Sequence, residues 1–164
     1  MKTTQEVAEL AHELMLEDLV ASETYLVYAM LIRDWGYAAL AAHFEHESLH
    51  ERQHATLQLE RLTYLDVPID LSRRPASPPT PESPRACLEA SLEMEVRVAE
   101  KLRELCVRCV ASKDEGTRQL AETLLVETEM DHILWLEQQL RMIGQLGEAQ
   151  YLAQMIHGEP ANGA

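Results

Sequence analysis

The sequence has few of the residues on which disulfide-bonded, β-rich or nucleic-acid-binding proteins depend. Three of its 164 residues are cysteines, too few and too odd a number for a disulfide framework. Aromatic residues make up 5%, while Leu, Ala, Glu and Met dominate, which favours helices over strands. The 14 basic and 28 acidic side chains give a net charge of −14. That charge argues against nucleic-acid binding, and it fits either attraction of cations or simple solubility.

The chain also lacks a long apolar run, so we expect no membrane span. Its N-terminus is acidic and amphipathic and has neither the basic nor the apolar region of a signal peptide. Cys106 and Cys109 form a C-x-x-C pair inside a helical pattern without a second pair, which favours buried structural thiols over a metal or redox site. These features predict one domain in a reducing cytoplasm.

Apolar residues recur with helical periodicity over four long segments. The pattern predicts one helical domain over residues 1–158 and a flexible tail over 159–164, with helices over about residues 4–34, 38–65, 84–112 and 115–143 and a short helix over 148–157. Pro84 suits a first helical turn, and Gly144 and Gly147 mark the end of the fourth helix.

The link between the second and third helices, residues 66–83, contains five prolines and cannot stay helical. A 28-residue helix is about 42 Å long, and a proline-rich stretch of some 17 residues spans about 53 Å. The link can therefore run the length of the bundle, whereas the other links are short enough for hairpins. The predicted fold is an all-α four-helix bundle with one long crossover and a short C-terminal fifth helix.

Each apolar stripe carries a carboxylate near its middle, and two stripes carry a histidine three residues later. The carboxylates are Asp18, Glu51, Glu95 and Glu129, and the histidines are His54 and His132. A carboxylate in a dry core costs several kcal/mol unless it is paired or binds a metal. No Lys or Arg lies on the central part of these stripes, so the pattern predicts two divalent cations held between the helices.

The Glu-x-x-His spacing alone is weak evidence, because it occurs four times in the chain. Only Glu51/His54 and Glu129/His132 place both residues on a core stripe, and Glu9/His12 is interpreted as solvated. The alternative for the selected set is a hydrogen-bonded polar layer. Tyr25, two turns beyond Asp18, is either a hydrogen-bonded core tyrosine or a redox participant.

Several stretches together resemble the bacterioferritin family over about residues 7–156. They are Asp18-Leu-Val-Ala with Tyr25, Asp34-Trp-Gly, His46-Glu-Ser followed by Glu51-x-x-His54-Ala, Glu129-x-x-His132-Ile-x-Trp-Leu-Glu, and Gly147-x-x-x-Tyr-Leu-x-x-Met-Ile. The resemblance implies a cage of 24 subunits, Fe(II) oxidation at a di-iron site within each subunit, and storage of an iron mineral in the cavity. A ferredoxin-type reductant is an implied partner.

The resemblance also implies roles for individual residues. Glu51 and Glu129 would be bridging carboxylates, His54 and His132 terminal ligands, and Glu95 a terminal carboxylate. Tyr25 would be the tyrosine beside the iron pair. By the same alignment His46 and His50 would face the cavity, where they could bind iron in transit; a solvated histidine face is the alternative.

Two positions depart from the family pattern. Asp18 stands where the family normally has Glu, so its oxygen falls about 1.3 Å short, against metal–oxygen bonds of about 2 Å. Arg52 stands where the family has the methionine that ligates haem iron, and a guanidinium cannot be that soft ligand. We therefore expect no haem b in the homomer, and Glu45 and Arg52 could pair across a dimer instead.

The sequence thus predicts a ferroxidase that oxidises Fe(II) to Fe(III) and stores it in a homo-oligomeric cage. Two alternatives remain open. One is a haem-less or impaired structural subunit that assembles with a haem-binding partner, which Asp18 and Arg52 favour. The other is a di-metal oxidase of an organic substrate, which would need an apolar pocket beside the metals.

Overall fold

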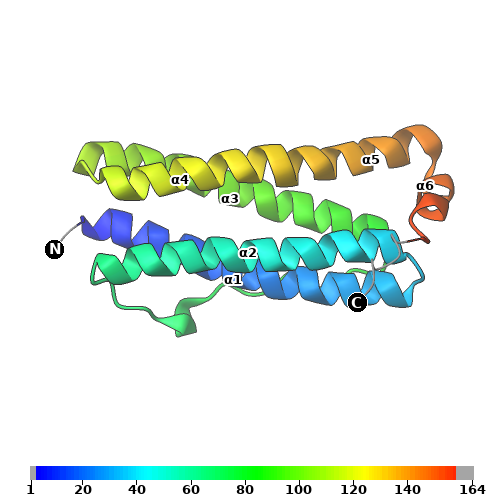
Figure 1. Cartoon of the computed structure of the whole chain (residues 1–164), viewed down its shortest axis with the longest axis horizontal. Helices are drawn as coiled ribbons and strands as arrows, with labels where there is room; N and C mark the ends of the chain where they lie inside the picture. Colours follow the sequence, from blue (N-terminus) through cyan, green and yellow to red (C-terminus); the bar gives the residue numbers. More distant parts are fainter. Residues whose placement is uncertain (1–2, 158–164) are drawn as a thin grey trace, which may run out of the picture.

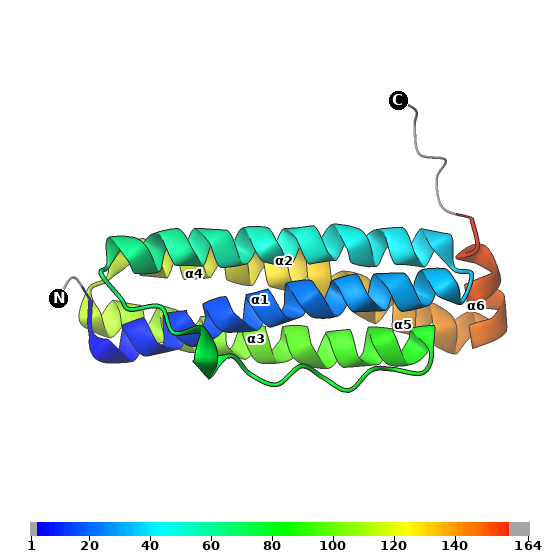
Figure 2. The ribbon, with the colours of Figure 1, turned by 90° about the horizontal axis from the view of Figure 1, so that it is seen from below.

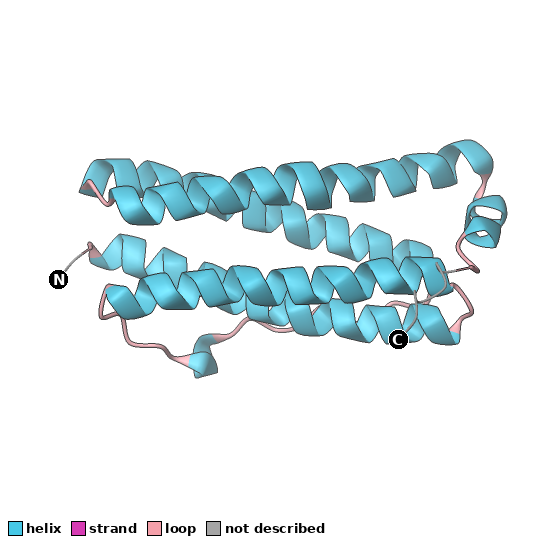
Figure 3. Cartoon of the chain, viewed as in Figure 1, coloured by secondary structure: helices cyan, strands magenta, loops and turns pink. Residues whose placement is uncertain are grey.

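Helices account for nearly all of the regular structure in the computed structural model, which describes residues 3–157 (Figure 3). Within that part of the chain there is no strand. The elements are α1 (Gln5–Asp34), α2 (Ala38–Tyr64), a short 3₁₀ turn η1 (Leu71–Arg73), α3 (Pro84–Ser112), α4 (Glu115–Glu127), η2 (Thr128–Ile133), α5 (Leu134–Leu146) and α6 (Glu148–Gln154). The predicted all-α class is confirmed, and the predicted tail over 159–164 lies outside the described residues.

The helix ends lie where the local sequence satisfies exposed backbone groups. The Thr4, Ser83 and Asp114 side chains accept hydrogen bonds from the first turns of α1, α3 and α4. Pro84 occupies the first turn of α3, where its missing N–H costs nothing. Gly36, at φ 95°, makes the tight turn between α1 and α2, a conformation that residues with a Cβ rarely adopt.

The connection between α2 and α3 crosses from one end of the bundle to the other, as its length and prolines predict. Figure 2 shows it running along α1 and α3 before α3 begins. In both hairpins, α1 with α2 and α3 with α4–α5, the two members lie antiparallel (Figure 1). This is the one-crossover four-helix bundle, and α6 closes one end of it, where the Ala39 N–H donates to the Met155 carbonyl at 3.0 Å.

His12 anchors the crossover to α1. Its Nε2 accepts a hydrogen bond from the Asp70 backbone N–H at 3.0 Å, and its ring is only 2% exposed. The interpretation of Glu9/His12 as a solvated pair is therefore wrong for the histidine. The sequence pattern near a helix end could not reveal that the crossover would fold back over it.

This anchor predicts a pH dependence of stability. Burial and the nearby charge of Arg73 lower the pKa of His12, so the folded state keeps it neutral where the unfolded chain, with a pKa of about 6.5, binds a proton. Its contribution is therefore present above the unfolded pKa and is lost as the pH falls below it. The unfolding midpoint should drop more steeply below about pH 6.5 in the wild type than in His12→Gln; parallel profiles would refute this role.

The apolar core is divided in two by a layer of polar side chains. One apolar cluster includes Tyr28, Ile32, Leu40 and Phe44, and the other includes Val7, Leu14, Leu62 and Leu102, both from several helices. Between them lies a set of buried polar residues at most 8% exposed: Asp18, Ser22, Glu47, Ser48, Glu51, His54, Gln58, Glu95, Thr128 and His132. The bundle thus encloses a polar layer at its middle, where the stripes predicted one.

The segment predicted as one straight helix over residues 115–143 is a single rod with a defect (Figure 1). It is α-helical to Glu127, forms a π-helical turn over Thr128–Ile133 and continues as α5 to Leu146. The π turn has consequences for the site, because it changes which side chains face inward.

Membrane-spanning helices are absent from residues 3–157, where each helix is too short or too polar to cross a bilayer.

Candidate metal centre

Five buried side chains from four helical segments meet in the polar layer. Asp18 lies on α1, Glu51 and His54 on α2, Glu95 on α3 and His132 on η2, and each is at most 3% exposed. Ligand atoms of Asp18, Glu51 and His54 lie within 4.8 Å of one another. The same holds for Glu51, Glu95 and His132. Glu51 belongs to both groups and so stands between two adjacent positions.

The contacts within the cluster run between carboxylate oxygens and the Nδ1 atoms of the two histidines. His132 Nδ1 lies 3.0 Å from Glu51 Oε1 and 3.3 Å from Glu95 Oε2. His54 Nδ1 lies 3.6 Å from Glu51 Oε2. We call these five residues and their inward-facing atoms the inner layer.

Burial and mutual repulsion shift the pKa values of the inner-layer carboxylates. Burial, with the charges of Glu51 and Glu95, raises the pKa of Asp18 well above its usual value. Burial and Glu51 likewise raise the pKa of Glu95. Burial also opposes ionisation of Glu51, but hydrogen bonds and charges from His132 and His54 outweigh it and lower its pKa to about 2.

His132 carries the compensating positive charge. Its burial disfavours the charged ring, but Glu51 and Glu95 outweigh burial and raise the pKa of His132 to about 11. Within residues 3–157, no Lys or Arg forms an ion pair with these five side chains. A proton on His132 therefore occupies, in part, the place that a cation would take.

Tyr25 and Gln58 hold the carboxylates from either side. The Tyr25 hydroxyl donates to Glu95, and the Gln58 amide donates to Asp18. Burial and the nearby carboxylates, Glu95 first among them, raise the pKa of Tyr25 well above its usual value, so the phenol stays protonated. Tyr25 lies beside the cluster, 2% exposed, and both of its sequence interpretations are compatible with this place.

Glu129 does not join the cluster. Its side chain is 39% exposed and pairs with Arg103 on α3. The predicted inward position rests on α-helical spacing, whereas a π turn closes its hydrogen bonds from i to i+5 and is wider. The side chains of residues three apart then no longer point in the same direction. Thr128, rather than Glu129, is buried together with His132, each at 2% exposure. The placement of Glu129 on the inner face is thus corrected.

Glu127 approaches the centre instead, and the sequence pattern did not single it out. Its Oε2 lies 2.9 Å from His54 Nε2. An acceptor at that distance holds a proton on Nε2 and leaves the Nδ1 lone pair facing Glu51. On an ideal α-helix Glu127 and Glu129 point about 200° apart. A helical pattern that places Glu129 on the inner face therefore places Glu127 on the outer face.

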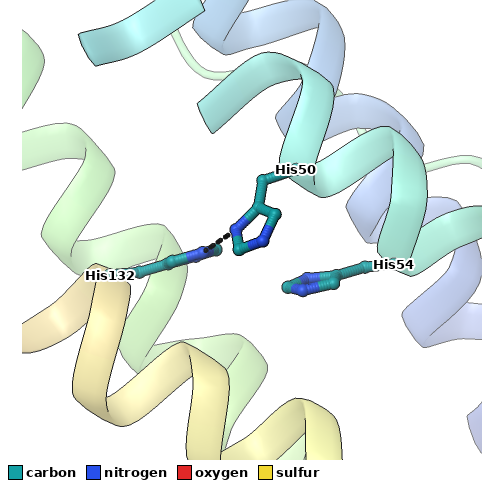
Figure 4. Close-up of side chains that lie close together, drawn as sticks. All are labelled: His50, His54 and His132. Atoms are coloured by element: carbon teal, nitrogen blue, oxygen red, sulfur yellow. Dashed lines mark hydrogen bonds between the residues drawn. The ribbon is translucent and has the colours of Figure 1, made fainter. Parts of the chain in front are cut away.

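A second set of polar side chains surrounds the outward faces of the two histidines; we call it the outer layer. His132 Nε2 lies 3.2 Å from Glu47 Oε2 and 3.2 Å from His50 Nδ1. His50, His54 and His132 converge from α2 and η2 (Figure 4). His46, whose side chain is 70% exposed, contacts Glu47 at 3.2 Å, so His46 and His50 form a path from the surface to the outer layer.

Glu127 also makes a direct prediction. Glu127→Gln should slow metal-dependent chemistry at this centre more than Glu129→Gln does, because Glu127 orients a histidine and Glu129 binds Arg103. The loss for an orienting carboxylate is about 10- to 100-fold in metal affinity or activity. Metal affinity of the two variants, measured side by side, checks this. A larger loss in Glu129→Gln would mean that Glu129 turns inward when metal binds.

The donor set fits a pair of divalent iron ions. Glu51 Oε1 and His132 Nδ1 are buried and lie 3.0 Å apart, and beyond the inner layer neither has a hydrogen-bond partner among residues 3–157. Three carboxylates and two imidazoles supply the hard oxygens and borderline nitrogens that Fe(II) and Fe(III) accept. A hydrogen-bonded polar layer, the alternative interpretation, does not explain why Asp18 and Glu95 are buried together although burial and neighbouring carboxylates raise their pKa values.

Arg52, which stands at the usual haem-ligand position of the family, and Glu45 lie on α2 outside the inner layer. Arg52 is exposed on the outer side of the helix, one residue beyond Glu51. Glu45, suggested as its partner across a dimer, forms an ion pair with Arg33 of its own chain, where Nη2 lies 2.9 Å from Oε2. Glu45 therefore already has an ion-pair partner within its own chain.

The chain is similar to known proteins over most or all of its length. The ferritin-like domain family matches residues 7–146. A bacterial ferritin of Paramagnetospirillum magnetotacticum is 34% identical over 165 aligned residues, which cover 100% of this chain and 99% of that protein. A bacterial ferritin of Synechocystis is 32% identical over 93% of this chain and 97% of its own length. A bacterioferritin of Mycobacterium leprae is 30% identical over 98% and 100%. The chain is therefore a member of the ferritin-like family and a homologue of the bacterial ferritins.

Proposed function

We propose that this protein is a ferroxidase and iron-storage subunit, which oxidises Fe(II) to Fe(III) at the inner layer and passes it to a stored mineral. The observation that carries the proposal is the sharing of Glu51 between two adjacent ligand groups, both buried and, within residues 3–157, both without a lysine or arginine ion-pair partner. One group uses Asp18 and His54, and the other uses Glu95 and His132. This arrangement suits two ions bridged by one carboxylate.

Each residue has a separate task in this proposal. The carboxylates lower the free energy of Fe(III) relative to Fe(II), because hard anionic oxygens favour the more highly charged ion. His54 and His132 supply neutral donors once His132 gives up its proton, so iron uptake releases protons. Tyr25 holds Glu95 in place, and Glu127 fixes the ring of His54.

We further propose that the subunits assemble into the 24-subunit homo-oligomeric cage implied by the family resemblance. Three free thiols, Cys87, Cys106 and Cys109, support a reducing, cytoplasmic location. A ferredoxin-type reductant would release the stored iron.

The haem prediction follows from Arg52. The purified homomer should show no haem Soret absorbance above a trace, since no methionine is available at that position. An absorption spectrum of freshly purified protein, with a pyridine haemochrome assay, checks this. Stoichiometric haem would overturn the interpretation of Arg52.

The second candidate is a structural subunit with an impaired centre in a mixed cage. The specific observation that favours it is the outward pairing of Glu129 with Arg103, which removes one expected bridging carboxylate. It predicts little oxidation by the isolated chain and full activity with a partner subunit.

Stopped-flow oxidation of Fe(II) by the purified homomer separates the two candidates. The ferroxidase proposal predicts a fast phase that saturates at two Fe(II) per subunit with O₂ or H₂O₂ as oxidant. The absence of any phase faster than protein-free oxidation would rule out the ferroxidase and favour the structural subunit. The mass of the assembly, measured on the same sample, tests the cage separately.

A further inference from the structure

His50, His54 and His132 bring three imidazole rings together (Figure 4). One ring nitrogen from each lies within 4.8 Å of the other two. His54 and His132 are each 3% exposed or less, and His50 is half-buried. The rings come from α2 and η2, so two segments that are remote in the sequence hold them together.

The closest pair already has the spacing of two ligands on one ion. Two nitrogens bound at about 2.05 Å to a tetrahedral metal lie about 3.3 Å apart. His50 Nδ1 and His132 Nε2 are 3.2 Å apart. The His132 side chain is 1% exposed, and its Nδ1 faces Glu51 and Glu95, so Nε2 is the nitrogen that it presents to His50.

The cluster is open on one side. His50 lines a surface hollow of about 440 Å³ together with His43, His46, Glu47 and Asp131. Apolar side chains, Met130, Leu134 and Trp135, also line it, and the histidines and carboxylates give a cation polar groups to bind beside His50. His46 lies next along this route, with its ring centroid 5.5 Å from that of His50.

The donor chemistry here differs from that of the inner layer. The inner layer offers three carboxylates, which favour hard ions such as Fe(III). Three imidazoles, all neutral once His132 gives up its proton, favour borderline divalent ions, with Zn²⁺ and Cu²⁺ above Fe²⁺. A three-histidine set also leaves a fourth tetrahedral position free.

We propose that His50, His54 and His132 form a separate nitrogen-only binding site for a borderline divalent cation of the Zn²⁺ type. The site shares two rings with the inner layer, and a neutral imidazole that ligates through one nitrogen normally keeps a proton on the other. His54, whose Nε2 proton is held by Glu127, therefore has a single lone pair to offer to either site. An ion in the three-histidine site therefore opposes occupancy of the inner layer through the same rings. Binding at this site does not depend on the proposed ferroxidase function.

The test uses Zn²⁺ titrations of the full-length, metal-free protein by calorimetry. The background is Glu51→Gln with Glu95→Gln, which removes the two carboxylates around His132 Nδ1 and leaves all three histidines. This background should bind one Zn²⁺ per chain. Adding His50→Ala should weaken that binding by about 100-fold or more, since loss of a direct ligand costs at least as much as loss of an orienting partner.

His46→Ala in the same background is the matched control, because it removes a neighbouring histidine that lies outside the three. It should leave Zn²⁺ affinity unchanged. Affinity that is insensitive to His50→Ala, or equally sensitive to His46→Ala, would overturn the proposal, as would no Zn²⁺ binding by a background protein whose helical circular dichroism is intact. Fe(II) oxidation by the wild type is measured separately, so failure of the ferroxidase proposal would remain distinguishable.

Discussion

Glu51→Gln should lower the rate of the fast phase of Fe(II) oxidation by about 100-fold or more, the largest loss expected from any single change in the chain. Glu51 is the one residue common to both ligand groups of the inner layer. The substitution keeps the shape of the side chain but removes the anionic oxygens that face His54 and His132, at 3.6 and 3.0 Å from their Nδ1 atoms. Both iron positions are therefore damaged together.

Stopped-flow absorbance under saturating Fe(II) measures this loss, and Glu60→Gln serves as the control. Glu60 lies on the same helix but is exposed, away from the polar layer. The control should oxidise iron at the wild-type rate, and both variants should retain the mass of the wild-type assembly. A fast phase of unchanged rate and stoichiometry in Glu51→Gln would remove the inner layer from the chemistry.

Asp18→Asn should have opposite effects on the metal-free and the metal-bound protein. In the metal-free protein, Asp18 is buried with Glu51 and Glu95 nearby, and its pKa is raised. A charge in that position destabilises the fold, whereas Asn keeps an oxygen that can accept from Gln58. We expect the variant to be more stable than the wild type without metal by roughly 1–3 kcal/mol.

The pH dependence of this difference has a defined sign. The folded state holds the Asp18 proton more tightly than the unfolded chain does, so the wild type loses stability as the pH rises above the unfolded pKa of about 3.9. The advantage of Asp18→Asn should therefore be present at neutral pH and shrink as the pH falls toward that value.

Metal should reverse the order. Anaerobic Fe(II) at about 1,000 times its dissociation constant stabilises a binding protein by about 4.1 kcal/mol, more than the advantage of the variant. Thermal unfolding with and without Fe(II) should show this gain in the wild type and a much smaller one in Asp18→Asn. If the variant gained as much as the wild type, Asp18 would not be a ligand, and the short side chain at this position would be a packing feature.

Much of the fold follows from local chemistry, because its determinants lie within a few residues of each other. Ser83 and Pro84 define the start of α3, and its observed bounds agree with the prediction. The prolines of the crossover exclude a fifth long helix, and the length of that segment permits the observed path (Figure 2). The polar layer was also predictable, since buried carboxylates such as Asp18 and Glu95 interrupt otherwise apolar stripes.

Two features of the structure could not be predicted from local sequence patterns. No glycine or proline lies within Thr128–Ile133 to mark the π turn there. The turn exchanges Glu129 for Thr128 on the inner face and brings Glu127 to His54. His12 was misjudged for a similar reason, because its partner is a backbone N–H fifty-eight residues away on the crossover.

In the proposed function, two iron ions bind on either side of Glu51. Anomalous X-ray scattering at the iron edge, from crystals soaked anaerobically with Fe(II), would locate these ions. Two peaks should appear in the polar layer, one between Asp18, Glu51 and His54 and the other between Glu51, Glu95 and His132. Iron found only at the surface near His46, with the inner layer unchanged, would show that the inner layer does not bind the iron pair.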